Sequence, residues 1–347
     1  MKRKRLIRYF FCNLLLTGLL ICLPINGQET SPPENNDFYD NEPFLKLPLP
    51  TIEISGEVLR TGPVNLKSLP LHQVQVREAR MENNKAVFVG AYVYLGYSLF
   101  DILREQPLSK KNKEQFSSPI DLLVIIENKK GEKAIFSWGE IFYPTVLHRI
   151  IIAVRVAPIV PSSTRESWHL PETSKVVAAN DLYSERNIED PVRIIVRSCP
   201  LSLDFNKGRT PLFSEKIKFL KQGEEKGVID DLPEAITSLT LPAVFFGRGQ
   251  GFHGIKFFTG VPLRLVLNNF FPIGKDDLKA GYLVLVAADG YRAVFSISEV
   301  FNRNDCQEII LCDQGHRDGG RFSIFPAPDF FSDRAVKSLK EIYLFDR

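Results

Sequence analysis

Two short segments of the chain place apolar residues at the spacing of a buried helical face. In each segment these residues follow the i, i+3, i+4 pattern: Leu99, Ile102 and Leu103 in one, and Leu263, Val266 and Leu267 in the other. Ser98 and Pro262 stand just before them, and both residue types suit the first turn of a helix. We therefore predict that a helix starts at each of these two places.

Two longer segments have the pattern of a β-hairpin. The apolar runs at 122–126 and 282–287 are each followed by a glycine-containing turn and a second apolar run. The second parts of the two hairpins, 131–142 and 290–301, match in residue type at an offset of 159. Because the offset continues without a gap, we expect a further strand after each hairpin.

A third pair of matching segments closes an internal repeat. Asp181-Leu182-Tyr183-Ser184-Glu185-Arg186 matches Asp329-Phe330-Phe331-Ser332-Asp333-Arg334, and an apolar strand follows each. Three matching blocks in the same order indicate a tandem duplication. The repeat predicts two strand-rich α+β domains, at residues 51–197 and 230–347, joined by a charged connector at 198–229.

The N-terminal segment has the layout of a secretory signal peptide. Five basic residues precede an apolar run at 10–23, and Gly27-Gln28 is a suitable cleavage position. We expect residues 1–27 to be removed, residues 28–50 to form a linker, and the protein to be periplasmic or secreted. The alternative is an uncleaved anchor, in which case this segment alone would contact a membrane.

Removal of the signal changes the charge of the protein. The whole chain has 44 basic and 41 acidic residues, a net charge of +3. The signal contains five of the basic residues and no acidic residue, which leaves 39 against 41 and a net charge of −2. The basic excess therefore belongs to export, and we expect no nucleic-acid partner.

Four blocks in the second domain resemble a known family. They are Gly260-Val261-Pro262-Leu263, the segment 289–296, the segment 319–324, and Arg334 through Ile342. In this order they resemble the oxidoreductase molybdopterin-binding domain, which has the sulfite-oxidase-type fold. The resemblance implies that fold for both domains, with a cofactor cleft ahead of the Gly-x-Pro-Leu helix.

The resemblance also implies a molybdenum-binding Cys thiolate, and the chain departs from the family at this point. The segments 71–95 and 232–259 contain no Cys, and Cys199 lies 61 residues ahead of Gly260. We therefore expect a non-catalytic ligand-binding or interaction module without a functional molybdenum centre, acting on a small anionic ligand or an envelope protein. The alternative is a periplasmic oxidoreductase that uses molybdopterin or another cofactor in an atypical site.

A glycine-rich segment is the place where a cofactor-binding residue is most plausible by this resemblance. Residues 249–254 match the GxGxxG pattern, but an apolar, strand-like run follows them where a dinucleotide site needs a helix. We expect a turn. Arg248 and His253 are the candidate cofactor-binding residues, since the segment would face the cleft and Arg favours anions.

Other reactive residues have structural interpretations. The repeat aligns Cys306 with Leu147 and Cys312 with Ala153, so we expect both Cys side chains in the core. Cys199 is also expected to be buried, although a free or interchain thiol stays open. We expect the recurring Asp and Arg residues of the third block to maintain the fold, with a catalytic pair as the alternative. We predict no metal site, because His72, His148 and His169 have no partners in sequence and the loop 312–318 fits no metal motif.

Overall fold

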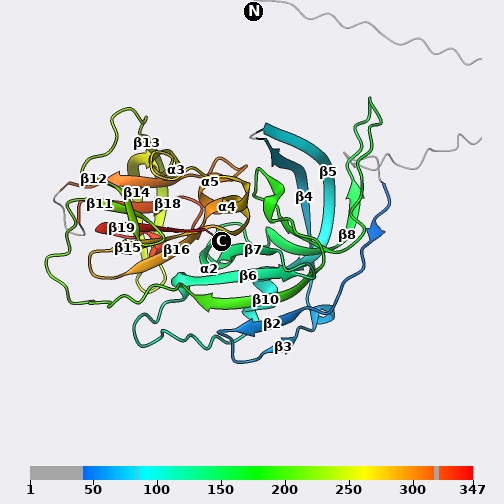
Figure 1. Ribbon diagram of the computed structural model, residues 1–347, viewed down its shortest axis with the longest axis horizontal. Helices are drawn as coiled ribbons and strands as arrows, with labels where there is room; N and C mark the ends of the chain where they lie inside the picture. Colours follow the sequence, from blue (N-terminus) through cyan, green and yellow to red (C-terminus); the bar gives the residue numbers. More distant parts are fainter. Residues whose placement is uncertain (1–41, 84, 316–319, 347) are drawn as a thin grey trace, which may run out of the picture. The chain divides into compact units, whose positions relative to one another are not determined.

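The structure is a computed structural model that describes residues 42–83, 85–315 and 320–346 (Figure 1). The predicted signal peptide and most of the predicted linker lie outside the described residues. The last part of that linker is ordered against the fold, because β1 (Leu45–Lys46) pairs with β8 and Leu47 is buried. The described residues belong to one compact unit.

The first half of the described chain, from β1 to β10, forms two sheets. One sheet has the order β3-β2-β10-β6-β7, in which β10 is parallel to β2 and antiparallel to β6. The other has the order β1-β8-β5-β4, with β9 also paired to β8. The strands are β2 (Glu53–Gly56), β3 (Gly62–Pro63), β4 (Leu71–Glu82), β5 (Lys85–Ser98), β6 (Leu122–Asn128), β7 (Lys133–Ser137), β8 (Ile150–Pro158), β9 (Lys175–Ala178) and β10 (Pro191–Ser198).

The second half, from β11 to β19, repeats this strand order. Its sheets are β12-β11-β19-β15-β16 and β13-β14-β17-β18, and β11 is parallel to β19 as β2 is to β10. The strands are β11 (Ile217–Lys221), β12 (Glu224–Ile229), β13 (Leu239–Gly247), β14 (Gly251–Pro262), β15 (Tyr282–Ala287), β16 (Arg292–Ser296), β17 (Ile309–Asp313), β18 (Phe322–Pro326) and β19 (Leu339–Phe345). Residues 217–229 of the predicted connector are thus two strands of a sheet.

Both predicted helix starts are confirmed. Helix α1 (Leu99–Arg104) begins after Ser98, whose side chain accepts a hydrogen bond from the Phe100 N–H, and α3 (Leu263–Leu267) begins after Pro262. These two helices use their apolar spacing to bury one face. A further helix, α4 (Lys275–Ala280), lies ahead of β15.

The two β-hairpins are present, but they end earlier than the sequence pattern suggested. Strands β6 and β7 pair, as do β15 and β16, and the chain then turns into α2 (Trp138–Phe142) and α5 (Ile297–Phe301). Both helices begin with a capping box, Ser137 with Glu140 and Ser296 with Glu299, which satisfies backbone N–H groups of the first turn. The prediction of continuous strand at these positions was wrong.

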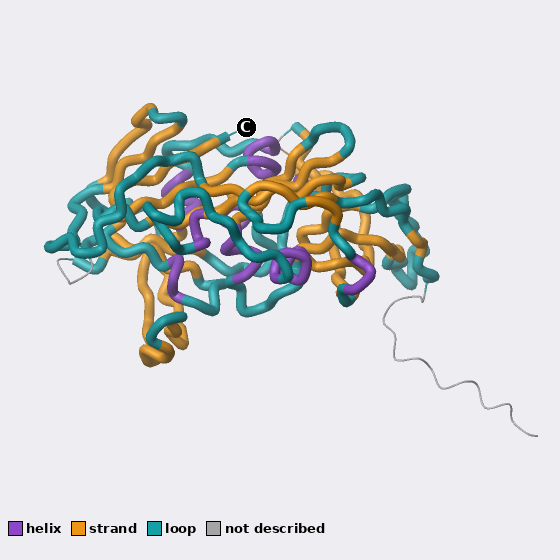
Figure 2. The backbone as a smooth tube through the Cα atoms, turned by 90° about the horizontal axis from the view of Figure 1, so that it is seen from below, coloured by secondary structure: helices purple, strands orange, loops and turns teal. Residues whose placement is uncertain are grey.

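Strands make up most of the regular structure, and the helices between them are short (Figure 2). Short 3₁₀ turns at Leu66–Ser68, Pro119–Asp121, Ser184–Arg186 and Ser332–Arg334 complete the regular elements of the described residues. Among those residues, no helix has the length and apolar character needed to cross a membrane. One hydrophobic cluster contains residues of both halves, such as Phe136 and Phe295, so the two halves share a core.

The cysteines divide into two groups. Cys199 and Cys312 are buried, as expected. Cys306 is exposed, so its assignment to the core was wrong. The reason is local: Cys306 lies in the loop before β17 and has a φ of 58°, which turns the chain away from the extended path that its alignment with Leu147 assumed.

Candidate functional site

The two halves exchange backbone hydrogen bonds in a reciprocal way. The segment that follows α2 in the first half contacts the segment ahead of the last 3₁₀ turn in the second half. In the same way, the segment that follows α5 in the second half contacts the segment ahead of the 3₁₀ turn Ser184–Arg186 in the first half. The bonds are Phe330 N to Tyr143 O (2.7 Å) and Thr145 N to Pro328 O (3.0 Å), matched by Leu182 N to Asn302 O (2.6 Å) and Asn304 N to Asn180 O (2.9 Å). Each half therefore supplies the same two segments to the contact.

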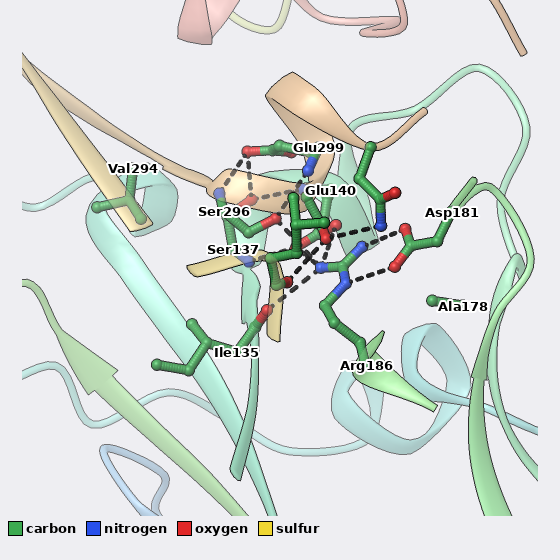
Figure 3. A network of polar contacts seen from close by, with 12 residues as sticks. Ile135, Ser137, Glu140, Ala178, Asp181, Arg186, Val294, Ser296 and Glu299 are labelled. Atoms are coloured by element: carbon green, nitrogen blue, oxygen red, sulfur yellow. Dashed lines mark hydrogen bonds and ion pairs between the residues drawn. The ribbon is translucent and has the colours of Figure 1, made fainter. Parts of the chain in front are cut away.

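A buried ionic cluster lies at this contact (Figure 3). Arg186 binds Asp181 at 2.7 Å and Glu140 at 2.9 Å within the first half, and its Nη1 donates to Ser296 Oγ of the second half at 3.1 Å. Arg334 repeats this pattern with Asp329 at 2.6 Å, Glu299 at 3.0 Å and Ser137 Oγ at 3.3 Å. Both Arg side chains are only 2% exposed.

The sequence positions this cluster through its capping boxes. Glu140 and Glu299 each occupy the third position of a helix whose first residue follows a Ser, so the carboxylate is held at the helix N-terminus where negative charge is favoured. Gly139 is required beside them, because a Cβ at this position would overlap the Arg334 guanidinium. The polar atoms of the cluster are thus used by one another, which supports the fold-maintaining interpretation of the Asp–Arg blocks.

The cluster contains two guanidinium groups and four carboxyl groups, so negative charge is in excess. Burial raises the pKa values of Asp181 and Asp329 although Arg186 and Arg334 oppose the shift. Burial raises the pKa of Glu299 to about 8, again against Arg334, and the nearby Glu140 adds to the rise. We expect the cluster to hold a proton near neutral pH.

A second polar cluster lies in the first half and consists of His72, Asp101 and His148. His72 Nε2 is 2.6 Å from Asp101 Oδ2, and His148 Nδ1 is 3.4 Å from the same oxygen. The two imidazole rings are stacked, with centroids 4.0 Å apart and an interplanar angle of 6°. The Asp101 side chain is 4% exposed, whereas those of His72 and His148 are 24% and 31% exposed.

Three separate elements bring these side chains together. His72 lies on β4, Asp101 in the first turn of α1, and His148 in the loop before β8. His148 has a φ of 64°, in the left-handed region that costs a residue with a Cβ some energy, so the surrounding structure fixes its backbone. Ser98, which caps α1, also places its Oγ 3.2 Å from His148 Nδ1.

The environment disfavours the protonated form of His148. Burial, together with the nearby His72 and Arg104, lowers the pKa of His148 although Asp101 acts in the opposite direction. A neutral imidazole has one nitrogen with a free lone pair, which can accept a hydrogen bond or bind a metal.

The cluster borders a crevice to which both halves contribute. His148 and Ser98 line a cavity of about 30 Å³ that also touches Asp181 and Arg186. Next to it is a larger cavity of about 400 Å³, and the two share the lining residues Pro144, Val146, Arg149, Asn180 and Arg303. The smaller cavity has room for about one water molecule.

The two cofactor-binding candidates from the sequence lie elsewhere. Arg248 is in the turn between β13 and β14, where its Nη1 donates to Tyr143 Oη at 3.0 Å. His253 is exposed on β14, with its ring 5.8 Å from that of Phe245. The glycine-rich segment leads into a strand, as expected, and no helix N-terminus follows it. A role for Arg248 and His253 toward an anion stays a prediction.

The sequence interpretation missed the His72–Asp101–His148 cluster, yet a signal was available. Asp101 aligns with Leu265, which places a charge on a helical face that is apolar in the second half. His72 pairs with Gly96, and Leu239 pairs with the equivalent Gly260, so His72 corresponds to Leu239. In the loop before β8 the residue with a positive φ is His148, and in the equivalent loop before β17 it is Cys306, so these two residues correspond.

Part of the loop 312–318 can also be described. Asp313 binds Arg321 at 3.0 Å and accepts a hydrogen bond from the Gly315 N–H, which is turn chemistry. His316 and its two following residues lie outside the described residues. His169 is exposed, and its backbone carbonyl accepts a hydrogen bond from Tyr92.

Comparison with known proteins adds no relative to this picture. No family model matches the chain, and a search of the curated proteins finds no match. The resemblance to the molybdopterin-binding domain therefore stays a prediction.

Proposed function

We propose that this chain is an exported, non-catalytic binding protein whose ligand site is the His72–Asp101–His148 cluster and the crevice beside it. The observation that carries the proposal is the convergence of three donor groups from three elements, with their ligand atoms within 4.8 Å of one another. The corresponding positions of the second half are Leu239, Leu265 and Cys306. The polar groups are therefore an addition to the framework that the halves have in common.

The environments of the two buried cysteines, Cys199 and Cys312, support the non-catalytic part of this proposal. A molybdopterin-domain-like fold would need a thiolate near the cofactor. Burial raises the pKa of Cys199 to about 11 and that of Cys312 to about 12, so both are thiols at neutral pH. Cys199 also packs within an apolar cluster with Tyr282 and Val284.

Elemental and optical analysis of the protein from its native host tests this function. We expect no molybdenum and no absorbance bands of a pterin or another redox cofactor after purification. Molybdenum in a stoichiometric amount, or a tightly held pterin, would contradict the proposal and favour a periplasmic oxidoreductase with an atypical site.

A second candidate function is docking to an envelope protein through the β13–β14 hairpin. The outer face of this hairpin carries the cross-strand pairs Val244–Ile255 and Pro242–Phe257, and Ile255 and Phe257 are 68% and 71% exposed. Exposed apolar patches of this kind mark interaction sites. A photo-crosslinking residue at position 255 should give a discrete adduct in cells, whereas one at Thr259, further along the same face, should not.

A further inference from the structure

The donor set of the first-half cluster is that of a transition-metal site. We propose that His72 Nε2, Asp101 Oδ2 and His148 Nδ1 bind one Zn²⁺ ion and leave a fourth position open toward the crevice. This inference rests on the proposed function, because it names the ligand of that binding site.

The chemistry of the donors selects the class of metal. Two imidazole nitrogens and one carboxylate oxygen suit a borderline-soft divalent ion such as Zn²⁺, which takes N and O ligands at ~2.0–2.2 Å. Ca²⁺ and Mg²⁺ prefer sites made of oxygen ligands, and one carboxylate with two imidazoles offers too few. Three protein ligands with an open position are also the usual composition of a non-structural zinc site.

One distance between the proposed ligand atoms already matches that of a tetrahedral site. With bonds of ~2.0–2.1 Å, two ligand atoms of a tetrahedral zinc site are roughly 3.3 Å apart. The distance from His148 Nδ1 to Asp101 Oδ2 is 3.4 Å, and that from His72 Nε2 is 2.6 Å and would have to lengthen. A ligated metal lies near the plane of each imidazole ring, so binding must also tilt the two rings out of their parallel stack.

A purely structural role explains the cluster less well. The second half builds the same strand order and the same helix with Leu239 and Leu265 in place of His72 and Asp101. Burial of the Asp101 carboxylate is unfavourable, and its partners, the partly exposed side chains of His72 and Arg104 and the N-terminus of α1, offset only part of that cost. The fold forms without these polar side chains in the second half, so we infer that in the first half they serve to bind a ligand.

Of the three proposed ligands, His148 is the one that lines the crevice described above. His148 and Ser98 line the cavity of about 30 Å³, which has room for a zinc-bound water, and the larger cavity lies next to it.

Calorimetric titration of the chain without residues 1–27 with zinc chloride, after removal of metals by a chelator, tests the inference. We expect one Zn²⁺ per chain, and a loss of affinity of about 100-fold or more in His72→Ala and in His148→Ala. His169→Ala is the matched control and should bind as the wild type does, because that ring is exposed and outside the cluster. Magnesium chloride should give no binding.

The variant Asp101→Leu separates loss of zinc binding from loss of the fold, because a Leu, Leu265, occupies the equivalent position of the second half. This variant should stay folded and lose zinc. NMR signals of the His72 and His148 rings should both shift on addition of zinc, whereas those of His169 should not.

Two results would overturn the zinc assignment: no zinc binding by the wild type, or wild-type zinc affinity in both His72→Ala and His148→Ala. Either result in a protein free of molybdenum and pterin leaves the proposed binding function standing with another ligand. Molybdenum or pterin in the native protein would instead contradict the proposed function itself.

Discussion

The same place in the two halves is polar in one and apolar in the other. In the first half, His72, Asp101 and His148 form a compact polar cluster. In the second half, Leu239, Leu265 and Cys306 line an open pocket together with Pro262 and Glu308. The difference teaches that the strand order does not dictate the chemistry of this place, whereas the ionic cluster between the halves is repeated almost residue for residue.

The largest expected effect tests the repeated part of the comparison. Arg186→Met and Arg334→Met should each lower the free energy of unfolding by about 3–5 kcal/mol, because each leaves two buried carboxylates without their cation. Urea denaturation followed by circular dichroism measures this. Arg193→Met is the control, since its ion pair with Glu127 is exposed and should contribute less than ~1 kcal/mol. A small effect for only one of the two buried Arg residues would show that the ionic clusters of the two halves do not contribute equally to stability.

A smaller effect on stability should distinguish the two halves at the aligned positions Gly139 and Ser298. Gly139→Ala places a Cβ against the Arg334 guanidinium and should destabilise the protein by about 1–3 kcal/mol through overpacking. Ser298→Ala, at the aligned position, removes the hydrogen bond that Ser298 Oγ donates to the Leu278 carbonyl and the one that it accepts from Asn302 Nδ2. It should cost about 1 kcal/mol, because Asn302 Nδ2 keeps its bond to the Tyr183 carbonyl. Thermal denaturation of both variants checks the order, and the opposite order would contradict it.

The pH dependence of stability should reveal the excess charge of the ionic cluster. Because the pKa of Glu299 is raised from 4.5 to about 8, the native state holds this proton more tightly than the unfolded chain. The free energy of unfolding should therefore fall as the pH rises from about 5 to 8, by ~1–3 kcal/mol. Glu299→Gln should flatten this dependence, and an unchanged slope in the variant would assign the proton elsewhere.

The smallest expected effect concerns the polar cluster itself. Without metal, Asp101→Leu should leave the melting temperature unchanged or raise the stability by up to ~1 kcal/mol, because a buried carboxylate is replaced by an apolar side chain that the second half accommodates. Differential scanning calorimetry in the presence of a chelator measures this. A clear loss of stability would show that the cluster supports the fold.

Local features of the fold were predictable from the sequence. Ser98 and Pro262 fixed the helix starts, and the turns after 126 and 287 fixed the hairpins, because these signals act over a few residues. The capping boxes at Ser137 and Ser296 were also readable but were overlooked inside an apolar run. Strand β11 was overlooked because Ile217 and Phe219, both buried, alternate with lysines in a segment that is charged on average.

The candidate site could not be predicted from the sequence in the same way. His72 is 29 residues from Asp101, which is 47 residues from His148, and sheet pairing and a left-handed loop residue bring them together. The repeat gave the one usable clue, the replacement of Leu265 by Asp101. The gapless alignment obscured another, because it paired Cys306 with Leu147, whereas the positive φ angles show that Cys306 corresponds to His148.

The reciprocal hydrogen bonds between the halves have a consequence for assembly. Because each half supplies both segments of the contact, a chain with one half alone would carry a self-complementary surface. Two such chains would close the same interface as a homodimer, with the same side chains repeated on both sides of it. Linking them in one polypeptide keeps the interface and removes the requirement for identity, so one half is free to carry a polar cluster where the other keeps Leu239 and Leu265.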